Sequence, residues 1–270
     1  MQVIGLCRFS YPGEGGFQVE HDNLAERMAY LYADARMEDR FRQFECVALP
    51  ALRNQTDPDF TFVVVIGDQM PARWRNRLEH LLSDMPQAII RAYPPGPHRT
   101  VMQTAINEAK QDPERPCLQF RHDDDDAVAV DFVERLRGVA LDCAGLVATN
   151  RLVGFDFNRG YSAEAGPDGI RAVENVMPLY GVALGMAVRG GVRQTIMNFG
   201  HKKLNRFMPV VSLTDSPMFV RGHNMFNDSR QKEGVATPNM KPLDAETRAL
   251  FKDRFCIDEE TIRRAFSGSA

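Results

Sequence analysis

The sequence predicts an α/β fold, in which a mostly parallel β-sheet is flanked by helices and is followed by an irregular C-terminal half. Through the first 145 residues, short apolar runs alternate with stretches of helical periodicity. The run 60–66, Phe-Thr-Phe-Val-Val-Val-Ile, is almost continuously apolar, as a parallel strand buried on both faces is. Strands and helices that alternate at this spacing form βαβ units, and hence a parallel sheet covered by helices.

Local patterns predict each element in turn. Apolar residues recur at helical spacing through 36–53 and 128–143, and Pro71 suits the first turn of a helix that continues to about Leu82. The first half is predicted to hold strands at 3–9, 60–66, 88–90 and 117–121 and helices at 36–53, 71–82, 100–110 and 128–143. Further on we expect short strands over 146–165, a helix near 179–188 and one or two terminal helices over 244–266. No repeat interrupts the chain, so residues 1–270 are expected to form a single domain.

Composition places the chain among globular proteins. Of its 270 residues, 44% are hydrophobic and 26% are charged, which are ordinary values for a folded domain. The formal net charge of -3 gives no overall attraction for nucleic acid, so we expect no nucleic-acid partner. The five cysteines are widely spaced and include no Cys-x-x-Cys pair, so they are expected to be reduced and mostly buried.

The N-terminal sequence shows no sign of export. It has no basic segment followed by an apolar core, as a signal peptide has. No apolar run approaches the roughly 20 residues that a membrane-spanning helix needs. We therefore expect a soluble, cytoplasmic protein, and peripheral contact with a membrane stays open.

Four consecutive aspartates follow the predicted strand 117–121, within the segment 121–127, Arg-His-Asp-Asp-Asp-Asp-Ala. Ligands of open α/β sheets bind beyond the carboxyl ends of the strands, where this segment lies. Carboxylate oxygens suit Mg2+ or Mn2+, and such an ion keeps one or two protein carboxylates and completes its shell with substrate phosphate. The alternative is that Asp125 or Asp126 caps a helix beginning near Val128. Capping accounts for only one or two of the acids, so we favour a site for a metal ion and a diphosphate.

The strand followed by Arg-x-Asp-x-Asp-Asp-Ala resembles the aspartate motif of glycosyltransferases with the GT-A fold, which is Rossmann-like. More narrowly, the chain resembles the bacterial family described as "putative rhamnosyltransferases". The resemblance covers about residues 3 to 230 and also rests on weaker matches at 8–10, 54–56, 62–68 and 220–224, the last being Val-Arg-Gly-His-Asn. It implies a nucleotide-sugar-binding half at 1–145, and an acceptor half with C-terminal helices at 146–270.

This resemblance implies a reaction. A sugar, with rhamnose as one candidate, would pass from a nucleoside-diphosphate donor to a glycan or another hydroxyl acceptor, as in surface polysaccharide synthesis. A divalent ion, Mn2+ or Mg2+, would stabilise the charge that develops on the leaving nucleoside diphosphate. The resemblance further implies that Asp125 and Asp126 hold the ion, and that Asp123 and Asp124 contact the nucleotide sugar.

Three further residues are implied at the donor site. Arg121 would face the diphosphate. Asp68, which ends the second predicted strand, would accept a hydrogen bond from the base or ribose, and Arg8, which ends the first, would line the same cleft. Taken singly, Arg8 and Asp68 fit an ordinary loop at the end of a strand equally well.

Histidines of the irregular half are candidates for a further metal ligand, which the resemblance implies. We favour His223, because the neighbouring Gly222 permits close approach, over His201, which heads a basic segment. His21, His80 and His98 lie in polar or helical surroundings and are expected at the surface.

The sequence does not identify the catalytic base that an inverting transferase needs. Asp156 and Asp215 lie in the acceptor half, and nothing singles out either. Two rival functions remain at this point. An aspartate-dependent phosphatase also places Asp-x-Asp after a strand, but normally after the first one. A non-catalytic nucleotide-sugar-binding or scaffold protein with the same fold would have no use for four adjacent negative charges.

Overall fold

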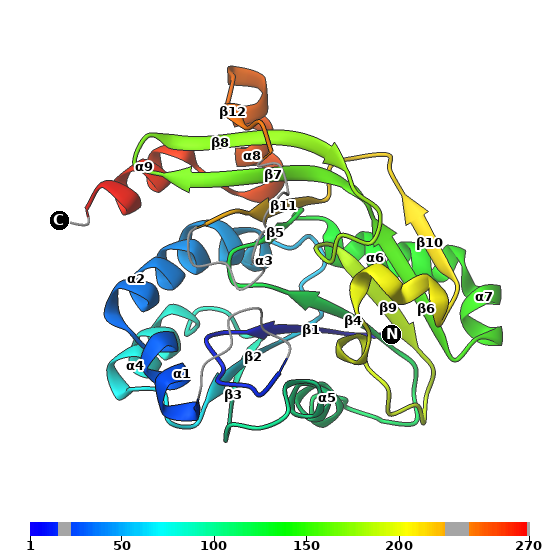
Figure 1. Ribbon diagram of the computed structural model, residues 1–270. Helices are drawn as coiled ribbons and strands as arrows, with labels where there is room; N and C mark the ends of the chain where they lie inside the picture. The colour runs from blue at the N-terminus through cyan, green and yellow to red at the C-terminus, as the bar shows by residue number, and fades with distance from the viewer. Residues whose placement is uncertain (16–22, 225–237, 269–270) are drawn as a thin grey trace.

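A seven-stranded sheet forms the centre of the fold in the computed structural model, which describes residues 1–15, 23–224 and 238–268 (Figure 1). Its strand order is β10-β6-β9-β4-β1-β2-β3. The bounds are β1 (Gln2–Arg8), β2 (Thr61–Gly67), β3 (Ala88–Tyr93), β4 (Cys117–His122), β6 (Leu152–Phe157), β9 (Leu184–Val188) and β10 (Val210–Leu213). Strands β3, β2, β1 and β4 pair in parallel, as do β6 and β10, whereas β9 is antiparallel to both its neighbours. The predicted α/β class with a mostly parallel sheet is therefore confirmed.

Helices cover both faces of this sheet. They are α1 (Leu24–Leu31), α2 (Asp34–Gln43), the π-helix η1 (Phe44–Ala48), α3 (Leu49–Arg53), α4 (Ala72–Leu81), α5 (His98–Glu108), α6 (Phe132–Asp142) and α7 (Ala144–Thr149). Alternate residues of β2 point to opposite faces: Phe62 packs in the cluster of α2, η1, α3 and α6, and Val63 in that of α5. This two-sided burial explains why the strand sequence is almost continuously apolar.

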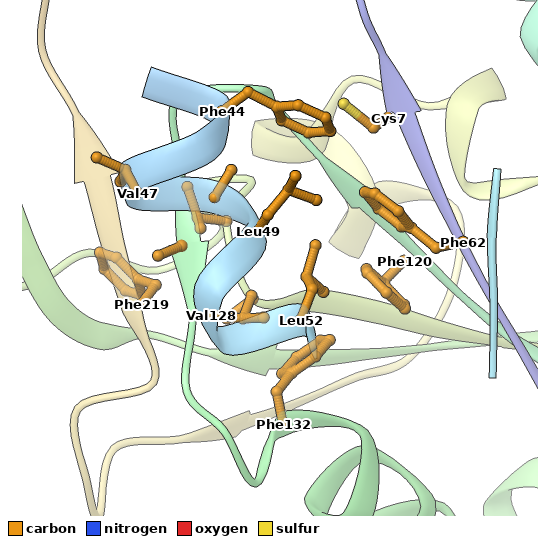
Figure 2. Packing of buried hydrophobic residues seen from close by; sticks show 14 of the residues in the cluster. Cys7, Phe44, Val47, Leu49, Leu52, Phe62, Phe120, Val128, Phe132 and Phe219 are labelled. Atoms are coloured by element: carbon orange, nitrogen blue, oxygen red, sulfur yellow. The ribbon is translucent and has the colours of Figure 1, made fainter. Parts of the chain in front are cut away.

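A second sheet of five strands lies above the first, in the order β12-β8-β7-β11-β5. Its strands are β5 (Ala127–Val128), β7 (Arg159–Gly166), β8 (Gly169–Val176), β11 (Phe219–Gly222) and β12 (Lys241–Pro242). Figure 2 shows the segment 44–53 between the two sheets, with Phe62 and Phe120 on one side and Val128 and Phe219 on the other. The acidic segment joins β4 of the first sheet to β5 of the second, so the aspartates lie where the two sheets meet.

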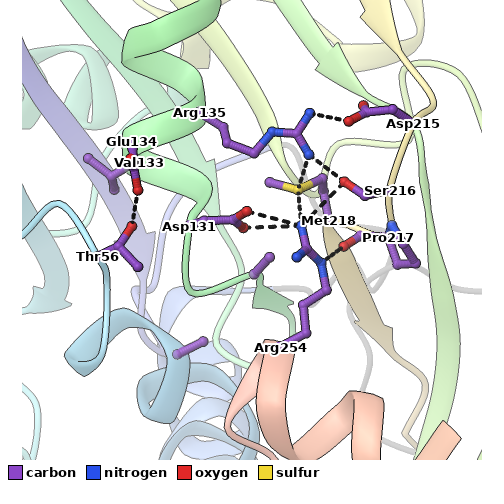
Figure 3. Close-up of polar contacts among 12 residues, drawn as sticks. Thr56, Asp131, Val133, Glu134, Arg135, Asp215, Ser216, Pro217, Met218 and Arg254 are labelled. Atoms are coloured by element: carbon purple, nitrogen blue, oxygen red, sulfur yellow. Dashed lines mark hydrogen bonds and ion pairs between the residues drawn. The ribbon is translucent and has the colours of Figure 1, made fainter. Parts of the chain in front are cut away.

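Helices α8 (Ala245–Phe255) and α9 (Glu259–Ser267) pack on the second sheet and lie in the segment where one or two terminal helices were predicted. Arg254 of α8 anchors them, because its Nη2 donates to both oxygens of Asp131, at 3.1 and 3.2 Å, and its Nε donates to the carbonyl oxygen of Pro217 (Figure 3). The 3-10 helices η2 (Ile196–Asn198) and η3 (His201–Arg206) follow β9. Among the described residues no helix is long and apolar enough to cross a bilayer. All five cysteines are free, and three of them are buried.

Three of the predicted elements are wrong in whole or in part. Residues 146–149, expected among short strands, belong to helix α7. The helix expected near 179–188 is instead β9, which is buried throughout and pairs with β4 and β6. A short run that is apolar at every position fits a buried strand and a buried helix equally well, so periodicity could not separate them. The helix expected from Val128 begins at Phe132, because Ala127 and Val128 pair with β11.

Candidate functional site

The carboxyl ends of β1 and β4 form one wall of a pocket. The two strands run parallel with Cys7 opposite His122, so that Arg8 and Asp123 leave the sheet side by side. Both residues line the pocket, together with parts of α2, α5, β11 and the segments 180–181 and 199–201. We call this the Asp123 pocket. It lies at the sheet edge where open α/β folds bind their ligands.

Arg40 of α2 neutralises the middle of the acidic segment. Its Nη1 lies 2.7 Å from Oδ1 of Asp124 and 3.4 Å from Oδ2 of Asp125. The side chains of Arg40 and Asp124 are only 4% and 8% exposed. A buried carboxylate needs such a partner, because removal from water disfavours its charge. In this structure Asp124 therefore holds Arg40, and its contact with a donor stays a prediction.

Strand β11 brings Gly222 against the aspartates. The Gly222 amide donates to Oδ1 of Asp126 at 3.0 Å, and Nδ2 of Asn224 donates to Oδ2 of Asp125 at 2.8 Å. A Cβ atom at Gly222 would lie 2.1 Å from the carbonyl oxygen of Asp125, so only glycine allows this approach. The segment 220–224, noted in the sequence, thus lies beside the acidic segment, although 96 positions separate Gly222 from Asp126.

Asp123 is the aspartate most open to the pocket. Its side chain is 40% exposed, whereas the three that follow are buried. Burial raises the pKa of Asp123, but the guanidinium groups of Arg121, Arg8 and Arg221 outweigh it and lower the pKa to about 2. Asp123 is therefore ionised at neutral pH and lies within electrostatic reach of three cations. Its neighbours at both strand ends, Arg8 and Arg121, were predicted at this site.

Asp125 and Asp126 are buried carboxyl groups whose negative charges are only partly balanced by nearby cations. Burial raises the pKa of Asp125, and burial with repulsion from Asp125 raises the pKa of Asp126 well above its usual range. A divalent cation beside them would relieve this repulsion, and carboxylate oxygens such as those of Asp125 and Asp126 suit Mg2+ or Mn2+. Within 1–15, 23–224 and 238–268, no three His, Cys, Asp or Glu side chains form a ready-made metal site. Phosphate oxygens and water would therefore complete the shell.

Arginines outnumber aspartates in the Asp123 pocket. Its described lining contains four aspartates and six arginines, Arg8, Arg36, Arg40, Arg99, Arg121 and Arg221. The pocket is therefore cationic before any ligand enters, which favours an anion such as a diphosphate. Arg36, Arg40 and Arg99 come from helices α2 and α5, and the sequence analysis missed them. Their spacing marks only the polar side of each helix, and it does not show that this side meets the ends of the strands.

Two predicted site residues, Asp68 and His223, are not among the described residues that line this pocket. Asp68 follows the end of β2 and is exposed. His223 follows β11 and donates its amide to β7. The pocket histidines are instead His201 and His98, and His98 is half-buried, which differs from the expected surface position. His21 lies outside the described residues. The roles of Asp68 and His223 stay predictions.

Neither aspartate considered as the catalytic base lines the pocket. Asp156 of β6 is 1% exposed, and its Oδ2 accepts the amide of Leu179 at 2.9 Å. Oδ2 of Asp215 accepts a hydrogen bond from Nη2 of Arg135 at 2.6 Å, in the network of Figure 3 that anchors α8. Both carboxylates therefore have structural contacts outside the site.

The sequence matches the family model described as "Putative rhamnosyl transferase" over residues 2–236. The chain belongs to this family. The resemblance drawn from the aspartate segment is therefore confirmed. No curated protein matches the sequence.

Solved structures resemble this rhamnosyl transferase family member only distantly. S. aureus TarS 1-349 is 11% identical, with a TM-score of 0.44 over 82% of this chain and 60% of that one. The same protein in complex with UDP-GlcNAc is also 11% identical, with a TM-score of 0.43 over 84% of this chain and 60% of that one. A "putative nucleotide-diphospho-sugar transferase" from Desulfovibrio desulfuricans G20 is 10% identical, with a TM-score of 0.32 over 82% of this chain and 80% of that one. The chain thus spans about 60% of the length of the TarS 1-349 structures.

Proposed function

We propose that this protein is a glycosyltransferase, which binds a nucleoside-diphosphate sugar in the Asp123 pocket and transfers the sugar, rhamnose, to a hydroxyl of a glycan acceptor. The observation that carries the proposal is the position of Asp123 among three guanidinium groups, at the carboxyl ends of two parallel strands. Such a site offers hydrogen-bond acceptors to sugar hydroxyls and cations to a diphosphate. Ionised Asp123 would accept hydrogen bonds from the ribose or the sugar.

The arginines would stabilise the leaving group. As the bond between the sugar and the diphosphate breaks, negative charge builds up on the bridging oxygen. Arg8, Arg121 and Arg221 all lower the pKa of Asp123, which means that they act electrostatically on one point of the pocket. Fixed guanidinium groups there stabilise the developing charge without reorganising, and each can bind phosphate oxygens in a bidentate manner.

A divalent ion, Mn2+ or Mg2+, is the second part of the proposal. Asp125 and Asp126 would hold it, with His223 as the predicted further ligand. When bound, the ion would supply Lewis-acid stabilisation of the departing diphosphate. The raised pKa values of Asp125 and Asp126 support this assignment, because a cation between them offsets their mutual repulsion.

A thermal-shift screen of UDP, dTDP and GDP, with MnCl2 or with EDTA, tests donor binding. A ligand at 100 times its Kd stabilises the folded state by about 2.7 kcal/mol. We expect one nucleotide to raise the melting temperature, and to do so more strongly with Mn2+. Asp123→Asn should abolish the shift, whereas Asp142→Asn, at an exposed position that ends α6, should keep it. An equal shift in both variants would place the nucleotide elsewhere.

The same preparation separates the rival functions. Release of nucleoside diphosphate from a nucleotide sugar supports the transferase, and hydrolysis of p-nitrophenyl phosphate would support a phosphatase. Binding of the donor without turnover would indicate a non-catalytic scaffold. We propose a cytoplasmic reaction in surface polysaccharide synthesis, and sedimentation with anionic vesicles tests the predicted peripheral contact with a membrane.

A further inference from the structure

The reaction proposed above needs a group that removes the proton of the acceptor hydroxyl, and one histidine in the Asp123 pocket is built for this task. His201 lines the pocket, and its Nδ1 lies 2.5 Å from the carbonyl oxygen of Leu179. We infer, on the basis of the proposed function, that His201 is the general base and that its Nε2 takes the proton. Asp156 is a positioning residue that acts on His201 through Leu179.

The aspartates of the pocket are less suited to this role. Asp123 has a pKa of about 2, so it holds a proton too weakly to remove one from a hydroxyl. Asp125 and Asp126 already accept hydrogen bonds from Asn224 and from the Gly222 amide. In neutral histidine, by contrast, one ring nitrogen always has a lone pair free to accept a proton.

The contact with Leu179 sets which nitrogen that is. A carbonyl oxygen can only accept, so Nδ1 must carry the hydrogen and donate it to Leu179. Nε2 is then the proton acceptor, and no described residue forms a hydrogen bond with it. When Nε2 takes a proton, the bond from Nδ1 to the carbonyl also stabilises the imidazolium. A base held by a third group in this way is the usual arrangement in enzymes that activate a hydroxyl.

The turn that presents the Leu179 carbonyl has an unusual backbone. Leu179 and Ala183 have φ of 54° and 49°, and Gly181 has φ of 103°. Non-glycine residues adopt positive φ at a cost in free energy, and they cluster at functional sites where the surroundings hold them. Oδ2 of Asp156 accepts the Leu179 amide at 2.9 Å and so holds this turn. A Cβ atom at Gly181 would lie 3.3 Å from Cγ of His201, so glycine leaves room for the ring.

The surroundings keep His201 neutral. Burial lowers its pKa below the usual 6.5, and the charges of Arg121, Arg221 and Lys202 lower it further, while the contact with Leu179 opposes them. These groups belong to β4, β11 and η3. The other pocket histidine, His98, has a pKa of about 3 because of burial and of Arg8, and is therefore the weaker base.

The step is a direct displacement. Nε2 of His201 takes the proton of the acceptor hydroxyl, and the acceptor oxygen forms a bond to the anomeric carbon of the sugar. The bond from that carbon to the diphosphate oxygen breaks, and its electron pair leaves with the nucleoside diphosphate. After the products dissociate, the imidazolium gives its proton to water. Displacement in one step inverts the configuration at the anomeric carbon.

Hydrolysis of the donor tests the inference, because water can take the place of the acceptor. Release of UDP from UDP-N-acetylglucosamine and of dTDP from dTDP-rhamnose is measured across pH for the wild type, His201→Gln and His80→Gln. His80 is an exposed histidine of α4 and serves as the matched control. We expect His201→Gln to lower kcat by about 10²- to 10⁴-fold, with the donor KM and melting temperature unchanged. The fall in the wild-type rate at acid pH, below the usual histidine pKa, should disappear in this variant.

Two further measurements separate a catalytic role from a structural one. Added imidazole should restore part of the activity of His201→Ala, and Asp156→Ala should lower kcat less than His201→Gln does, at an unchanged donor KM. Wild-type kcat in His201→Gln, or a loss of Mn2+-dependent donor binding in place of kcat, would overturn the inference. If the wild type neither binds nor hydrolyses either donor, the proposed function itself fails, and the inference fails with it.

Discussion

The buried pair of Arg40 with Asp124 gives the sharpest prediction for stability. Arg40→Met keeps much of the side-chain volume but removes the cation that lies 2.7 Å from Asp124 and 3.4 Å from Asp125. At an effective dielectric constant of about 20, opposite charges about 4 Å apart attract by about 4 kcal/mol. Loss of one partner of a buried pair costs about 3–5 kcal/mol. For a chain of this size the melting temperature should fall by roughly 6–20 °C.

A double-mutant cycle measures this pair directly. Arg40→Met, Asp124→Asn and the double variant are unfolded in urea and by heat. Because Asp124→Asn removes the charge that Arg40→Met leaves unpaired, the double variant should recover part of the loss, with a coupling energy of about 1–3 kcal/mol. The loss should also shrink at acid pH, where carboxylates take up protons. A cost for Arg40→Met of under about 1 kcal/mol, or one that is the same with and without Asp124, would refute the reasoning.

Two further predictions concern the same segment. Burial and the charge of Asp125 raise the pKa of Asp126, so the free energy of unfolding falls as pH rises through that pKa. Without metal, Asp126→Asn should therefore melt at a higher temperature than the wild type at pH 7, and its melting temperature should depend less on pH. A lower melting temperature would contradict this. Gly222→Ala places a Cβ atom 2.1 Å from a backbone oxygen of Asp125, so it should lower both the melting temperature and the affinity for nucleotide. The control is Gly138→Ala in α6, where a Cβ atom meets nothing within 4 Å, and it should raise the free energy of unfolding by about 0.4–1 kcal/mol.

The first half of the fold could be predicted from sequence because its elements are regular. Strands such as β2 are buried on both faces, and the helices between them keep one apolar side, so each pattern has one physical meaning. In the second half the strands are short and belong to two sheets. The apolar run of β9 was taken for a helix because burial on all sides erases any period.

The sequence predicted only those site residues that are close along the chain or that lie at the ends of paired strands. Arg121 and Asp123 share a strand end, and Arg8 follows from the parallel pairing of β1 with β4. Arg40 and His201 reach the same pocket from α2 and from the start of η3, through contacts that no local pattern encodes. Preference for His223 over His201 rested on the neighbouring glycine, and the structure shows Gly222 in close approach to the backbone of Asp125.

The most direct test of the central claim is the position of a bound nucleoside diphosphate. Crystals grown with dTDP or UDP and Mn2+ would show the diphosphate through its phosphorus density and the ion through its anomalous signal. The account predicts the diphosphate within hydrogen-bonding distance of Arg121 and Arg221, and the manganese peak at Asp125 and Asp126. A diphosphate ordered at another face of the protein, with the acidic segment still in contact with Arg40, Asn224 and Gly222, would contradict it.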